Sequence, residues 1–190
     1  LSYDINCTDV DNITLIYYAN KSELNINSVD GKFTWTPVNA DVGNHTVNFT
    51  CSDALLNNSQ QIVIEVKNTN DAPVLNAITA QNINEESGLN TLNLATFASD
   101  VDVGDTISYV LDAENAAQVD CNINGNNLEF TPQLNFNGTA SCDVHAKDLA
   151  NAVSVTRTVT INVANVNDDP TLAVLADKTY AEDSGLQNNI

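Results

Sequence analysis

The chain repeats one short stretch almost unchanged, since NDAPVL at residues 70–75 returns 97 positions later as NDDPTL at residues 167–172. At the same spacing, EESGL at 85–89 returns as EDSGL at 182–186. Further landmarks share an offset of 95: FTWTP at 33–37 with Gly43 and Asp53, against LEFTP at 128–132 with Gly138 and Asp148. Motifs that recur in one order indicate an internal repeat, and its period of about 95 residues sets the size of the folding unit.

The repeat divides the chain into three parts. Residue 1 corresponds to about Leu92, so the N-terminal part begins inside a repeat. We therefore expect residues 1–70 to form a domain without its first strand and residues 71–168 to form a complete one. Residues 169–190 would be the first strand region of a third repeat. They would either continue a longer array or complete a domain of the next subunit, a form of β-strand addition.

Each period is typical of β-strands. Ile62, Ile64 and Val66 alternate with outward-facing residues, and the same pattern returns at 159–163. Turn signals such as Asn124-Gly125 fall at short intervals. About seven short strands in about 95 residues is the pattern of an immunoglobulin-like sandwich. The sequence predicts an all-β protein of tandem immunoglobulin-like β-sandwiches.

The composition excludes some partners. Against 25 Asp and Glu there are only six Lys and Arg, which gives a formal net charge of −19. Such a field repels nucleic acid and anionic membranes but attracts divalent cations. Hydrophobic residues make up 43%, enough for a packed core. No apolar run approaches the about 18–20 residues of a membrane-spanning helix, so we expect no such segment.

Several motifs together resemble the tandem cadherin-like repeats of microbial surface proteins and adhesins. They are NTNDAP at 68–73, the Glu pair at 85–86, SDVDVGD at 99–105, and FTP and FNGT at 130–132 and 136–139. The resemblance spans both repeats. It implies extracellular cadherin-like (Ig-like) domains in series, commonly with calcium at their junctions.

The acidic and amide residues that would meet between domains suit calcium, which takes six to eight oxygen ligands. For the first junction they are Asn68, Asn70, Asp71, Asp100, Asp102, Asp105 and Asp148. For the second they are Glu86, Asn165, Asn167 and Asp168, with further ligands on a neighbouring subunit. In residues 1–70 the equivalent acids are Asp9, Asp11 and Asp53, a poorer set. If residues 100–102 are extended, both carboxylates face the same way. The alternative is that these residues simply populate turns.

Four cysteines allow three pairings. Cys7 and Cys51 align with Ala98 and Ala146 of the other repeat, and Cys121 and Cys142 align with Leu24 and Val47. Replacement of a contacting apolar pair by a disulfide therefore predicts Cys7–Cys51 and Cys121–Cys142. Buried free thiols are the alternative, and zinc is disfavoured because neither histidine has metal-ligand spacing. Disulfides would place the protein in an oxidising compartment.

Asn-X-Ser/Thr sequons are concentrated in the first 70 residues, which makes glycosylation plausible there. They begin at Asn6, Asn12, Asn20, Asn44, Asn48, Asn57 and Asn137.

The function we predict is structural: calcium-stiffened domains that build a cell-surface filament or stalk outside the cell, with copies joined head to tail. The alternative is an adhesin module that recognises a glycan or protein at a cell surface. An enzyme is not expected, because His45 and His145 do not occupy shared positions in the repeats and no nucleophile, phosphate-loop or metalloprotease motif occurs.

Overall fold

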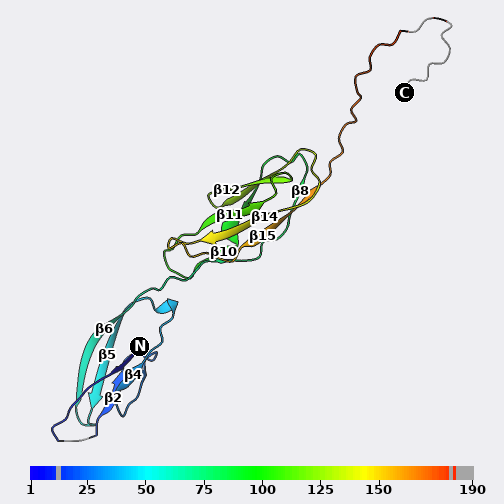
Figure 1. The fold of residues 1–190 in the computed structure, drawn as a ribbon. Coiled ribbons are helices and arrows are strands. Elements are labelled where there is room, and N and C mark those ends of the chain that lie inside the picture. The colour runs from blue at the N-terminus through cyan, green and yellow to red at the C-terminus, as the bar shows by residue number, and fades with distance from the viewer. Residues whose placement is uncertain (12–13, 180–181, 183–190) are drawn as a thin grey trace.

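The computed structural model describes residues 1–11, 14–179 and 182 of the chain. Figure 1 shows two groups of strands lying end to end, and residues 165–179 leave the second group as a segment without strands. The other regular elements described are two short 3-10 helices, η1 (Asn39–Asp41) and η2 (Leu94–Thr96). Neither has the length or apolar composition needed to span a bilayer. The predicted all-β fold is confirmed.

The first sandwich packs two three-stranded antiparallel sheets, of order β1-β4-β3 and β2-β5-β6. Its strands are β1 (Ser2–Asp4), β2 (Ile16–Ala19), β3 (Asn25–Ile26), β4 (Lys32–Thr34), β5 (Gly43–Ser52) and β6 (Asn57–Val66).

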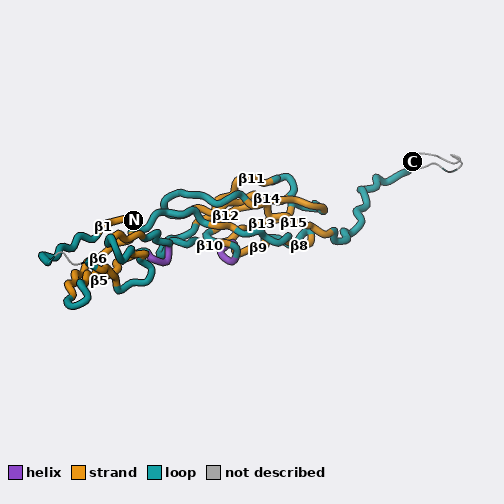
Figure 2. Tube along the Cα trace, turned by 90° about the horizontal axis from the view of Figure 1, so that it is seen from below, coloured by secondary structure: helices purple, strands orange, loops and turns teal. Residues whose placement is uncertain are grey.

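The second sandwich, at the centre of Figure 2, packs a four-stranded sheet of order β11-β14-β15-β8 against β12-β13-β9. A short antiparallel pair, β7 with β10, closes one edge, and β8 runs parallel to β15. The strands are β7 (Val74–Leu75), β8 (Gln81–Asn84), β9 (Asn90–Asn93), β10 (Ala98–Ser99), β11 (Ser108–Glu114), β12 (Val119–Asn124), β13 (Asn127–Pro132), β14 (Gly138–Lys147) and β15 (Arg157–Ala164). The predicted boundaries at 70/71 and 168/169 stay a prediction.

The two cores differ in size. Fourteen residues form the buried cluster of the second sandwich and five that of the first. Along β15, Val159, Ile161 and Val163 are at most 5% exposed. Their counterparts on β6 are only half-buried. The difference follows from the sheet orders, because β8 covers the outer edge of β15 whereas β6 is the last strand of its sheet.

Each sandwich contains one disulfide bond. Cys7–Cys51 ties the segment after β1 to β5, and Cys121–Cys142 joins β12 to β14 across the second core. This is the pairing predicted from the aligned repeats. A disulfide stabilises chiefly by restricting the unfolded chain, so its loss removes a larger share of the stability from the sandwich with the smaller core.

Reduction should therefore unfold the first sandwich before the second. Cys7–Cys51 spans 44 residues and Cys121–Cys142 spans 21, which chain entropy converts to about 4 and about 3 kcal/mol. Trp35, the single tryptophan, is buried in the first core. Its fluorescence should report a melting transition that falls strongly on reduction. Cys121→Ala with Cys142→Ala should leave that transition in place, and a Trp35 transition insensitive to reductant contradicts the prediction.

Candidate metal centre

Three acidic side chains meet at the end of the second sandwich that faces the linker. Asp100 and Asp105 flank the loop after β10, and Asp148 directly follows β14. One carboxylate oxygen of each lies within 4.8 Å of the others. Asp148 is only 3% exposed, and the other two are half-buried. Among the described residues this is the only such group of three.

The loop from Asp100 to Asp105 is a tight turn. The Asp102 amide donates to Asp100 Oδ1 at 2.9 Å, and the Asp105 amide donates to the Asp102 carbonyl at 3.2 Å. Gly104, with φ of 89°, takes the left-handed conformation that the turn needs. The expected extended conformation of residues 100–102 is therefore wrong. Asp side chains commonly bond the backbone two residues on, and here that turn replaces a strand.

The Asp148 loop is fastened to the same turn. Asp148 Oδ1 accepts from the Ala152 amide at 2.7 Å, and Asp105 Oδ1 accepts from the Leu149 amide at 3.2 Å. These bonds satisfy backbone donors and hold two carboxylates from distant parts of the sequence side by side.

The linker is bonded to both sandwiches. Asn70 Nδ2 donates to Asp148 Oδ2 at 2.8 Å, and the Asp71 amide donates to Asp102 Oδ2 at 2.8 Å. From the first sandwich, Asn39 Nδ2 of η1 donates to Asp71 Oδ2 at 2.7 Å. Asn68 is exposed. Of the predicted set, the structure thus gathers every member except Asn68 around the junction.

The group fits a calcium ion in size. Two ligands on opposite sides of one ion are at most about 5 Å apart, twice the Ca–O distance of about 2.3–2.6 Å. The oxygens of Asp100, Asp105 and Asp148 satisfy that limit.

The unpaired charges fit a cation as well. In the described part of the chain, four buried side-chain oxygens lack a hydrogen-bond partner, and two of them are Asp100 Oδ2 and Asp102 Oδ1. The one ion pair found there joins His145 to Asp112, so no basic side chain offsets these carboxylates. A buried charge without a partner is costly, and a bound cation removes that cost.

At the opposite end of the second sandwich the acid that faces inward is Glu85 rather than the predicted Glu86. Glu85 is 2% exposed, and its Oε1 accepts from Asn165 Nδ2 and the Val166 amide, both at 2.6 Å. Its Oε2 is another of the partnerless oxygens. Glu86, Asn167 and Asp168 are exposed. The alternation of β8 carries the signal that identifies Glu85, because it lies two residues beyond inward-facing Ile83.

Among the described residues, the acidic side chains of the first sandwich do not join a group of this kind. Asp9 Oδ1 accepts from the Asp11 amide at 2.7 Å. Asp53 Oδ1 accepts from the amides of Leu56 and Leu55 at 2.6 and 2.8 Å, and these bonds lower the pKa of Asp53 below its usual value. The structure therefore places Asp9, Asp11 and Asp53 as turn-forming residues.

The remaining predicted sites are the sequon asparagines. Asn48 is half-buried, and five other sequon asparagines are exposed: Asn6, Asn20, Asn44, Asn57 and Asn137. Asn12 lies outside the described residues. Glycosylation stays a prediction.

Both histidines contact nearby polar groups. His45 Nε2 lies 2.6 Å from the Asp41 carbonyl, and His145 Nδ1 lies 2.7 Å from Asp112 Oδ1. These contacts show no catalysis, and the expectation that the chain is not an enzyme stays a prediction.

Comparisons with known proteins agree with this architecture. Residues 70–162 match the family model described as "Bacterial Ig domain". No curated protein is similar enough in sequence to count as a relative. A structure of human protocadherin-24 EC1-2 aligns at 18% identity over 88% of each chain, with a TM-score of 0.60. Protocadherin Gamma B7 cadherin domains 1-4 align at 23% identity over 80% of this chain and 42% of theirs, with a TM-score of 0.55. Likenesses at such identities show the fold alone.

The sandwich fold and the family match define the class of Ig-like β-sandwich domains, and the two disulfides suit an oxidising compartment. The fold is that of a cadherin-like, Ig-type repeat, and residues 70–162 match the bacterial Ig domain family. The resemblance inferred from the sequence motifs is confirmed.

Calcium should raise the stability of the parent chain, by about 2.7 kcal/mol at a concentration of 100 times its Kd. Asp100→Asn with Asp105→Asn should abolish that gain in differential scanning calorimetry. In EGTA this variant should be at least as stable as the parent, because it removes two mutually repelling charges. Asp120→Asn changes an exposed acid on β12 and should keep the full calcium response. A parent whose melting temperature is the same in calcium and EGTA contradicts the site.

Proposed function

We propose that the chain is a structural extracellular protein in which calcium at the domain junction stiffens a cell-surface filament or stalk. The observation that carries this proposal is the position of the carboxylates. Asp100, Asp105 and Asp148 gather where the linker is hydrogen-bonded to both sandwiches. An ion at that point acts on the angle between domains.

The physical effect follows from the charges. Two unit charges 4 Å apart repel by roughly 4 kcal/mol at an effective dielectric constant of 20. Without a cation, this repulsion favours opening of the loops and release of Asn70 and Asp71. A bound divalent ion reverses the sign of the interaction and fixes the loops and the linker in one arrangement.

The filament itself would form by head-to-tail contact between copies. Residues 169–179 are exposed beyond the second sandwich, and within the described part of the chain β6 is the last strand of its sheet. A contact between two different surfaces generates an open chain of subunits when the rotation between successive copies does not close a ring.

Trypsin offers a direct test of junction stiffness. Lys67 is exposed and immediately precedes the linker, so cleavage after it requires the linker to open locally. Calcium should slow this cleavage in dilute parent protein, where copies do not associate. Lys178 lies in the exposed C-terminal segment and serves as the internal control, since its cleavage should not respond to calcium.

The variant Asp100→Asn with Asp105→Asn should lose the protection at Lys67 while its cleavage at Lys178 stays unchanged. Equal cleavage after Lys67 in calcium and in EGTA contradicts a stiffening role. If calorimetry shows that calcium binds but the rate of cleavage after Lys67 does not change, the ion stabilises only the loops around it.

A further inference from the structure

We infer that the short helix η1 is the element through which the first sandwich responds to the ion, with Asn39 as its positioning residue. The inference deepens the junction role proposed above and rests on it. It names the contact by which an ion held in one sandwich limits the movement of the other.

The candidate ion site by itself belongs to the second sandwich. Asp100, Asp105 and Asp148 all lie on loops of that sandwich, and within the described part of the chain no acidic side chain of the first sandwich joins them. An ion bound there orders the loops that hold it. Stiffening of the junction therefore requires a further contact that reaches the first sandwich.

One hydrogen bond supplies that contact. Among the described residues, a single hydrogen bond joins residues 1–66 to residues 70–179, in which Asn39 Nδ2 donates to Asp71 Oδ2 at 2.7 Å. The Asp71 amide donates in turn to Asp102 Oδ2 at 2.8 Å. Asp71 is thus held by its backbone to the second sandwich and by its carboxylate to the first. When the loop at 100–105 is closed, it presents the Asp71 carboxylate to Asn39.

The helix η1 is fixed to the core of its own sandwich. The Val38 amide donates to Asp41 Oδ2 at 2.9 Å, and the Asp41 amide donates to the Val38 carbonyl at 2.8 Å. His45 Nε2 lies 2.6 Å from the Asp41 carbonyl. The His45 ring packs edge-on against buried Trp35, with ring centroids 5.0 Å apart. η1 therefore moves with the core of the first sandwich rather than as a loose loop.

The linker runs beside η1 as well. Val38 and Asn39 border the same hollow as residues 66–69, and the trypsin site Lys67 belongs to that stretch. Cleavage after Lys67 requires this stretch to leave the hollow, and the bond from Asn39 to Asp71 holds the chain just beyond it. The rate of this cleavage therefore reports on the bond.

The second repeat lacks this arrangement. At the offset of 95, Asn39 corresponds to Leu134 and His45 to Ala140. A leucine side chain has no hydrogen bond to donate, and Leu134 is 80% exposed. The contact is therefore a feature of the first repeat and not of the fold that the repeats share.

The test compares Asn39 with two replacements in the trypsin assay. In calcium, Asn39→Ala should raise the rate of cleavage after Lys67 about fivefold, as expected for the loss of one ordinary hydrogen bond. Asn39→Asp should raise the rate further, because its carboxylate would repel that of Asp71. Asp and Asn both suit turns, so a residue that served only the conformation of η1 would tolerate this second change.

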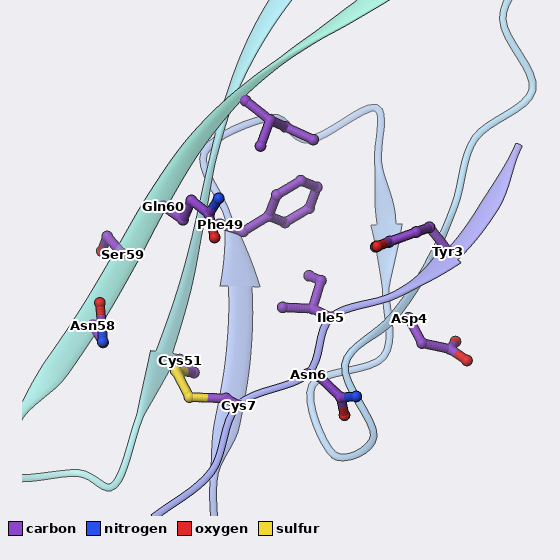
Figure 3. A pocket seen from close by; sticks show the side chains of 11 residues that line it. Tyr3, Asp4, Ile5, Asn6, Cys7, Phe49, Cys51, Asn58, Ser59 and Gln60 are labelled. Atoms are coloured by element: carbon purple, nitrogen blue, oxygen red, sulfur yellow. A yellow bond between two sulfur atoms is a disulfide. The ribbon is translucent and has the colours of Figure 1, made fainter.

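Asn58→Ala is the matched control. Asn58 is exposed at the end of β6 far from the linker, where it pairs with Cys51 beside the disulfide (Figure 3). Its loss should leave cleavage after Lys67 unchanged. The melting transition reported by Trp35 should stay in place in all three variants. Calorimetry should show that Asn39→Ala weakens calcium binding by no more than the same fivefold, because coupling between the ion and the contact is reciprocal.

A distance measurement checks the angle between the sandwiches directly. The native cysteines are all in disulfides, so spin labels can be attached through Gln61→Cys on β6 and Asp120→Cys on β12, which are both exposed positions. Calcium should narrow the distribution of distances between the labels. Addition of Asn39→Ala should keep the distribution broad even with calcium bound.

The outcomes separate this inference from the proposed function. Calcium protection of Lys67 that is equal in the parent and in both Asn39 variants overturns the role of η1 and leaves stiffening to the linker alone. A narrow distance distribution in Asn39→Ala does the same. Equal effects of Asn39→Ala and Asn39→Asp, or a lowered Trp35 transition, overturn the positioning role, because Asn39 then acts only within its own sandwich. A parent without calcium protection overturns the proposed function, and this inference with it.

Discussion

Burial of every second residue along the central strands organises the second sandwich. On β14, Ala140, Cys142, Val144 and Ala146 all face the core, at most 4% exposed. Asp148 is the next inward position, so the alternation that buries these side chains also places a carboxylate at the end of the core. At the other end, Glu85 continues the inward series of β8 in the same manner. Both buried acids therefore lie one step beyond the last apolar side chain, where loops and linkers can bond them.

That placement explains how a strongly acidic chain keeps two carboxylates almost out of water. Backbone and amide N–H groups solvate them in place of solvent: Ala152 and Asn70 donate to Asp148, and Asn165 and Val166 donate to Glu85. Hydrogen bonds to a charged acceptor are stronger than neutral ones. They do not neutralise the charge, however, and Glu85 Oε2 still lacks a partner. Both ends of the sandwich thus hold a buried acid that only N–H donors solvate.

The features that could be predicted from the sequence are those that depend only on the spacing of residues. The repeat and its alternation indicated the sandwich fold, and alignment of Cys7 and Cys121 with apolar residues gave both disulfides. The convergence of Asp105 with Asp148 depends on a bond from the Leu149 amide, 44 residues away, which no local pattern encodes. The turn at residues 100–105 was not predicted from the sequence, for a related reason. A prediction from alternating residues assumes a strand. The bond from the Asp102 amide to the Asp100 side chain forms a turn, and that turn ends the strand.

The Cys7–Cys51 disulfide fixes a segment of the first sandwich that hydrogen bonds fix in the second. In the second sandwich, pairing of β10 with β7 holds Ala98 against the core. Cys7 is the residue that aligns with Ala98, and Cys51 aligns with the fully buried Ala146. A covalent bond thus fixes the segment that hydrogen bonds fix in the other repeat.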